Sequence, residues 1–70
     1  MKMTPVISSN IKEIGHDPAG KVLHITFKNG KTYEYADVPA FKHEELLAAE
    51  SQTKHFNMYI RPAHKCTPLA

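Results

Sequence analysis

The last third of the chain carries the residues best suited to chemistry. Lys54, Asn57 and Arg61 follow one another at spacings of three and four residues, so a helix would place them on one face. Their ammonium, amide and guanidinium groups donate hydrogen bonds suited to a carboxylate or a phosphate. Arg61 is the only arginine, so a planar bidentate donor exists at one position. The alternative is structural: Arg61 pairs with a glutamate of a preceding helix or of another subunit, and Asn57 caps backbone groups.

A second candidate binding segment lies near the N-terminus, where Ser8, Ser9 and Asn10 directly precede a predicted strand. Short polar side chains and backbone N–H groups at such a position could form a polar wall for a ligand. Ser9 and Asn10 are the candidate ligand-binding residues of this segment. The alternative is local capping of the turn and the strand edge.

The sequence gives weak support for metal binding or catalysis. His55, His64 and Cys66 form the only local cluster of metal-ligating residue types, and their spacing matches no known ligand pattern. Cys66 has no evident activating base, no carboxylate pair faces another across a predicted cleft, and a Gly-rich phosphate loop is absent. We therefore expect a protein without enzymatic activity, catalytic residues, metal or cofactor.

The length of the chain limits the elements that can position these residues. Seventy residues, 41% of them hydrophobic, allow one domain with a small core. At this size about 25 cal/mol per Å² of buried apolar area is nearly balanced by about 1.5 kcal/mol of lost entropy per residue. Cys66 is the lone cysteine, so no intrachain disulfide can add stability. Association with a second copy would add it, and we predict a homo-oligomer.

Charge is unevenly distributed although the net charge is only +2. Residues 1–33 carry five lysines against two acids, and residues 34–50 carry five acids against one lysine. Residues 51–70 carry three basic residues and no acid. The basic last segment could hold an anion, or the acidic middle of one copy could dock on the basic end of another. The alternative is a solvated surface of mixed charge.

Signals for membranes and export are weak in this sequence. No apolar run approaches the roughly 18 residues of a membrane span, and residues 1–10 lack the apolar stretch of a signal peptide. A lone cysteine is typical of a reducing compartment. These patterns predict a cytoplasmic protein that has no membrane partner.

The middle of the chain predicts a β-hairpin. Residues 22–28 alternate between apolar and polar side chains, as a half-buried strand does. Asn29 and Gly30 follow, and both tolerate the positive φ angles of a tight turn. Residues 31–36 alternate again and form the return strand.

The loop length of this hairpin decides which face Tyr33 and Tyr35 occupy. A two-residue loop would place both rings opposite the apolar face, as an exposed platform on which a ligand could stack. A three-residue loop with Gly30 as a G1 bulge would pair Ile25 with Tyr33 and Leu23 with Tyr35, which gathers the large side chains on one face. We predict the bulge, because so small a core needs both rings. Tyr33 and Tyr35 remain candidate ligand-binding residues.

The flanking segments complete an α+β fold. Residues 11–16 predict an earlier strand with a bulge, since Ile11 and Ile14 have opposite parity, so the sheet would be a three-stranded antiparallel meander. Asp37 is a plausible N-cap for a first helix, and a second short helix ends at Pro62. One or two short C-terminal helices would pack on one face of the sheet. We assign residues 1–7 to an N-terminal extension, 8–64 to the domain and 65–70 to a C-terminal tail.

The order and spacing of these residues resemble the KTSC domain family. The matching residues are Ser8-Ser9-Asn10-Ile11, Leu23-x-Ile25-x-Phe27-x-Asn29-Gly30, Tyr33-x-Tyr35, Val38-Pro39, Ala49-x-Ser51, Phe56-Asn57 and Ile60-Arg61. This family is named for a C-terminal segment of some lysyl-tRNA synthetases, and it also occurs as small stand-alone bacterial and phage proteins. The resemblance implies a three-stranded sheet packed against one or two helices, and its synthetase context suggests nucleic-acid binding.

This sequence departs from the family pattern at four positions. Thr53 stands where the family usually has glycine, so the turn before the second helix should differ. His16, His43 and His64 stand where the family often has an aromatic residue. If those aromatic positions belong to the core, the core of this copy is more polar; if they line a site, the site of this copy differs from that of the family.

The leading functional hypothesis is a small, non-enzymatic binding module for a phosphate-bearing ligand. Sequestration of a small nucleotide signal, as by a phage-type protein, is one form that the size, the charge and the phage members of the family suggest. One alternative is an RNA-binding or other nucleic-acid-binding accessory domain. Another is a module for protein interaction or oligomerisation.

Overall fold

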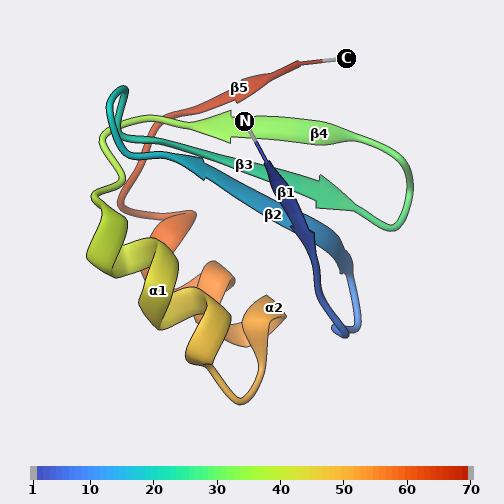
Figure 1. Ribbon diagram of the computed structural model, residues 1–70. Coiled ribbons are helices and arrows are strands. Elements are labelled where there is room, and N and C mark those ends of the chain that lie inside the picture. The colour runs from blue at the N-terminus through green and yellow to red at the C-terminus, as the bar shows by residue number, and fades with distance from the viewer. Residues whose placement is uncertain (1, 70) are drawn as a thin grey trace.

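The computed structural model describes residues 2–69, which form one antiparallel sheet with a helical layer on one face (Figure 1). The elements are β1 (Met3–Pro5), β2 (Ile11–Asp17), β3 (Val22–Phe27), β4 (Thr32–Tyr35), α1 (Ala40–Ala48), α2 (Gln52–His55), the π-helical turn η1 (Phe56–Ile60) and β5 (Cys66–Pro68). The strands lie in the order β1-β2-β3-β4-β5. None of the helices in this part of the chain has the length and apolarity needed to cross a membrane.

The α+β class is confirmed, but the predicted number of strands is wrong. The meander β2-β3-β4 forms the centre of the sheet, and β1 and β5 add an edge strand on each side. These two strands come from the segments expected to be an extension and a tail. Each has three residues, and both end in proline. Proline has no backbone N–H group to donate to a neighbouring strand, so it is tolerated at the edge of a sheet. Met1 and Ala70, the outermost residues of those segments, lie outside the described residues.

The hairpin between β3 and β4 has the predicted bulged register. Ile25 pairs with Tyr33 and Leu23 pairs with Tyr35. The amide of Gly30 donates to the carbonyl of Phe27 at 2.9 Å, and Gly30 has a φ of +89°, a left-handed conformation that glycine adopts without strain. Both tyrosines therefore lie on the face of the sheet that the helices cover.

The first central strand carries the predicted bulge. The pairing of β2 with β3 shifts register between Ile11 and Glu13. This extra residue allows Ile11 and Ile14, which have opposite parity, to be fully buried on the same face. The opposite parity of Ile11 and Ile14 in the sequence thus correctly predicted a bulge in this strand.

The start of the first helix differs from the prediction. Asp37 is not an N-cap: it adopts a left-handed φ of +58°, and α1 begins at Ala40 after Pro39. The turn carries Val38 into the core, where its amide donates to the carbonyl of Lys21 at 2.8 Å. Burial of Val38 therefore fixes the chain direction into α1.

The hydrophobic core lies between the sheet and the helical layer. Its buried members are Ile11, Ile14, Leu23, Ile25, Tyr35, Val38, Leu46, Phe56 and Ile60. The opposite face of the sheet carries no helix (Figure 1) and is more polar, with Thr26 and Thr32 hydrogen-bonded at 2.9 Å and His24 placed 3.4 Å from Glu34. The candidate site lies on the face of the sheet that the helices cover, between the helical segments and the loops at the end of the sheet.

Candidate functional site

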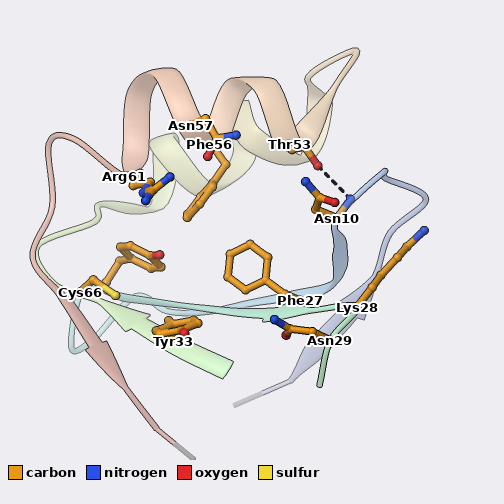
Figure 2. Close-up of a pocket in the computed structure, with 11 residues that line it drawn as sticks. Asn10, Phe27, Lys28, Asn29, Tyr33, Thr53, Phe56, Asn57, Arg61 and Cys66 are labelled. Carbon is orange, nitrogen blue, oxygen red and sulfur yellow. Dashed lines mark hydrogen bonds between the residues drawn. The ribbon is translucent and has the colours of Figure 1, made fainter. Parts of the chain in front are cut away.

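A cleft of about 490 Å³ opens between α2, η1 and the sheet (Figure 2). Its lining residues come from distant parts of the chain and are Asn10, Phe27, Lys28, Asn29, Tyr33, Tyr35, Thr53, Phe56, Asn57, Arg61 and Cys66. Figure 2 shows Arg61 and Cys66 at one end, Asn10 and Thr53 at the other, and Phe27 between them. The cleft is thus an elongated space with polar ends and an aromatic centre.

Three aromatic side chains hold each other edge to face beside the cleft. The ring of Phe27 lies 5.7 Å from the rings of both Tyr33 and Phe56, at interplanar angles of 70° and 67°. Phe56 is buried, whereas Phe27 and Tyr33 are half-buried and pack against the core from its margin. Edge-to-face packing fixes these rings, so the exposed parts of Phe27 and Tyr33 form a rigid apolar surface.

Arg61 supplies a guanidinium group that points into the cleft (Figure 2). It follows η1, and its amide donates to the carbonyl of Phe56 at 3.0 Å, which closes the π turn. Within residues 2–69 Arg61 forms no ion pair, so the alternative in which it neutralises a glutamate of α1 does not describe this chain. Its charge is therefore available to a ligand.

The balance of charge in the cleft is positive. Its cations are Arg61 and Lys28, and no carboxylate occurs among its described lining residues. Asn10, Asn29 and Asn57 add amide groups that can both donate and accept hydrogen bonds. An anionic ligand that carries hydrogen-bonding groups would thus meet complementary chemistry.

Thr53 joins the N-terminal loop to α2. Its hydroxyl lies 2.6 Å from the hydroxyl of Ser8 and accepts a hydrogen bond from the amide of Asn10 at 3.3 Å (Figure 2). Glycine, the residue expected from the family pattern at this position, could make neither bond. Thr53 therefore positions Asn10 at its end of the cleft.

Tyr35 and Cys66 pair across β4 and β5 at the other end. Burial raises the pKa of the Tyr35 hydroxyl well above its ordinary value, a hydrogen bond with Cys66 raises it further, and the nearby charge of Arg61 opposes this shift. Tyr35 therefore stays neutral at physiological pH and acts as a hydrogen-bonding group rather than a base.

The structure brings five of the seven predicted binding residues to the cleft: Asn10, Tyr33, Tyr35, Asn57 and Arg61. Ser9 is exposed and does not line it, and its neighbour Ser8 is the serine that bonds Thr53. Lys54 lies on another side of α2, in a hollow with Glu50 and Met58. The chain changes from α-helical to wider π-helical winding at Phe56, so an α-helical spacing does not place Lys54 beside Arg61.

Six lining residues were absent from the prediction: Phe27, Lys28, Asn29, Thr53, Phe56 and Cys66. Lys28 and Asn29 follow directly from the bulged hairpin, whose loop they form, and that loop could have been added to the site. Cys66 could not, because β5 has no sequence signal that places it beside Tyr35.

The histidines lie away from the cleft. His16 and His43 stack with ring centroids 5.0 Å apart, and His16 bonds the carbonyl of Val38 at 2.6 Å. His64 donates from Nδ1 to the carbonyl of Ala36 at 2.9 Å, and its Nε2 accepts from Lys42 at 3.0 Å. Within residues 2–69 no three histidine, cysteine or acidic residues gather as they would around a metal ion.

Acidification should destabilise the fold through His43. Burial lowers the pKa of His43 most, the neighbouring His16 lowers it further, and Glu44 opposes this shift. The Nε2 atom of His43 is buried and has no hydrogen-bond partner among the described residues. The native state therefore binds this proton less readily than the unfolded state. The free energy of unfolding should fall as pH drops below 6.5, the ordinary pKa, and level off below the native-state pKa.

The His43→Phe variant tests this expectation by urea denaturation between about pH 7 and pH 5. Phenylalanine fills the site without a titratable group, so the variant should lose part of the pH dependence of the wild type. Equal slopes for both proteins would show that His43 does not contribute.

Comparison with known proteins identifies the class of this fold. The sequence profile of the KTSC domain family matches residues 7–64, so the chain belongs to the KTSC domain family, as the spacing of its residues predicted. A KTSC domain protein from Yersinia pestis, solved by crystallography, is 34% identical and superposes with a TM-score of 0.92 over 99% of this chain and 97% of that one. An alignment of that extent includes both edge strands.

Two further relatives differ in how much of their own length matches. A protein from Tsukamurella paurometabola is 40% identical over 67 residues, which cover 96% of this chain and 100% of that protein. A lysine–tRNA ligase from Nostoc punctiforme is 36% identical over 62 residues, which cover 89% of this chain but 11% of the ligase. The fold thus occurs both as a small protein and as one part of a larger enzyme.

Proposed function

We propose that this protein is a small, non-enzymatic binding module whose cleft takes a phosphate-bearing ligand, a nucleotide being the class that fits best. The observation that carries the proposal is the composition of the cleft. One space is surrounded by an unpaired guanidinium, a second cation, three asparagine amides and two rigid rings. Its described lining residues include no carboxylate.

The phosphate would bind at the end of the cleft that holds Arg61. A guanidinium donates two parallel hydrogen bonds to phosphate oxygens, which gives orientation as well as attraction. Asn57, on the η1 turn that precedes Arg61, adds an amide donor to the same wall. Lys28, at the opposite rim, strengthens the positive potential. Its ammonium group acts as a point charge and does not need two aligned acceptor atoms, as a guanidinium does.

The base of the nucleotide would lie against Phe27 and Tyr33. Stacking on an aromatic side chain contributes about 1–3 kcal/mol per base. The amides of Asn10 and Asn29 are available for the polar edge of the base. A volume of about 490 Å³ lies within the roughly 300–1,000 Å³ of small-molecule sites.

We propose binding without a catalysed reaction, because the described lining residues can orient and attract a ligand but include no general base. Sequestration of a small nucleotide would need nothing more. The proposal places the protein in the cytoplasm, where a lone free thiol such as Cys66 stays reduced.

RNA binding is the second candidate, and the lysine–tRNA ligase relatives favour it. In that case the cleft would hold one nucleotide of a longer strand, and other cations would contact neighbouring phosphates. Binding through several phosphates weakens steeply with salt, whereas binding of a single nucleotide does not. Titrations with a mononucleotide and with a short single-stranded RNA at two salt concentrations separate the two candidates.

A thermal-shift screen of mononucleotides, dinucleotides and cyclic nucleotides tests the proposal. A ligand at a hundredfold excess over its Kd stabilises the native state by about 2.7 kcal/mol. For a chain of this size, that raises Tm by about 10 °C or more. Adenosine and guanosine, which lack phosphate, are the matched controls and should shift Tm far less. Absence of any shift with nucleotides would overturn the proposal.

A further inference from the structure

Large apolar side chains are exposed on the outer side of the helical layer. Met58 and Tyr59 on η1 are 54% and 55% exposed. Lys42 and Glu45 line one hollow with Tyr59, and Glu50 and Lys54 line another with Met58 and Tyr59. We call the surface formed by Lys42, Glu45, Glu50, Lys54, Met58 and Tyr59 the helical patch.

The helical patch has a ridge between two hollows. The ring of Tyr59 packs on that of His55 at a centroid distance of 4.7 Å, and both side chains line each hollow. The hollows measure about 410 Å³ and about 600 Å³. Because the rings of Tyr59 and His55 lie beside a hollow, the same ring pair of another copy could enter that hollow.

Opposite charges are balanced across this surface. One hollow is lined by Lys42 and Glu45, and the other by Glu50 and Lys54. This contrasts with the positive cleft, and it disfavours nucleic acid or a strongly charged protein as the occupant. A patch with equal numbers of acids and lysines is complementary to its own copy turned about a two-fold axis, because a two-fold contact pairs two different points of the same surface.

We propose that the helical patch binds the helical patch of a second copy of this chain. Tyr59 of one copy seats in a hollow of the other, and the lysine of each hollow meets a glutamate of the partner. Contiguous exposed apolar side chains rimmed by charged groups are a common mark of such contacts. The contact would also bury Met58 and Tyr59, and a 70-residue chain has few other apolar side chains with which to gain stability.

This surface is separate from the nucleotide site. Asn57 and Arg61 line the cleft, whereas Met58 and Tyr59 line a hollow of the helical patch, so η1 presents two faces. Self-association would therefore leave the cleft open. The test below needs no nucleotide, and its result does not depend on the proposed ligand.

Sedimentation velocity of the full chain, from micromolar to about 1 mM, tests the proposal. The wild type should show a monomer–dimer equilibrium. Tyr59→Glu should sediment as a monomer throughout and keep its circular dichroism spectrum, because the side chain is exposed. Ile7→Glu, at an exposed apolar position outside the patch, should dimerise like the wild type.

Charge reversal gives the sharpest result. Glu50→Lys and Lys54→Glu each place like charges across the contact and should weaken dimerisation at least tenfold. An equimolar mixture of the two variants should recover the dimer as a heterodimer. A wild type that stays monomeric at about 1 mM, a dimer that survives Tyr59→Glu, or a mixture that stays monomeric would overturn the proposal.

Discussion

Replacing Arg61 with alanine should weaken nucleotide binding at least tenfold while leaving the fold intact. A hydrogen bond to a charged group contributes about 1.5–3 kcal/mol, which corresponds to roughly a 10- to 150-fold change in Kd. Arg61 is exposed and forms no ion pair within residues 2–69, so its removal leaves no buried partner unsatisfied. Titration calorimetry with the best nucleotide of the screen measures the change.

Two further variants show whether position and geometry matter as well as charge. Arg61→Lys keeps the charge but loses the planar fork, and it should recover only part of the affinity. Lys54→Ala removes one positive charge from outside the cleft and should bind the nucleotide as the wild type does. An equal loss of affinity in Arg61→Ala and Lys54→Ala would show that general electrostatic attraction, rather than the cleft, is responsible.

Replacing Phe56 with alanine should destabilise the protein by about 3–5 kcal/mol. The side chain is 2% exposed, and its ring packs edge to face against Phe27 and Tyr35 at 5.7 Å and 5.1 Å. A 70-residue domain has a free energy of unfolding of only about 4–10 kcal/mol, so the variant should be largely unfolded at the weak end of that range.

Urea denaturation followed by circular dichroism measures this loss, with Met58→Ala as the matched control. Met58 also lies on η1 but is 54% exposed, so its truncation should change the free energy of unfolding by less than about 0.5 kcal/mol at concentrations where the chain is monomeric. Similar losses in the two variants would show that η1 is not fastened to the sheet by Phe56.

The centre of the sheet could be predicted because several local signals agree there. Alternation from Leu23 to Phe27, the turn chemistry of Gly30 and the need to bury two tyrosines all point to one register. The opposite parity of Ile11 and Ile14 likewise indicated the bulge in β2. In each case the physical requirement acts within a few residues of the signal.

The edge strands could not be predicted, because their pairing depends on partners distant in the sequence. Cys66–Pro68 has no alternation and contains proline, and it becomes a strand because Tyr33, Glu34 and Tyr35 of β4 offer an open edge. Met3–Pro5 depends on β2 in the same way. One of them contributes to the candidate site, since β5 brings Cys66 into the cleft beside Tyr35.

The candidate site was predicted in part for the same reason. Asn57 and Arg61 lie within one turn of helix, so their meeting needs only local geometry. Lys54 was misplaced because the winding changes at Phe56, where the side chain inserts into the core. The contribution of Phe27 and Thr53 required knowledge of how α2 lies over the sheet.

The aromatic side chains show how a small domain can form a core and a site at once. Tyr33 and Phe27 pack against the core with one part of the ring and line the cleft with another. Burying the tyrosines was therefore not an alternative to using them for a ligand. In a chain of 70 residues, the margin of the core is one surface on which rigid aromatic groups are available.

A nuclear magnetic resonance titration of ¹⁵N-labelled protein with adenosine monophosphate, guanosine monophosphate and a cyclic dinucleotide tests the central claim most directly. At least one of these probes should shift the amide signals of Asn10, Asn57 and Arg61, with saturation at one ligand per site. The same probe should leave Arg61→Ala nearly unchanged. Shifts centred instead on His24 and Thr26, on the far face of the sheet, would contradict the account, as would the absence of shifts with every probe.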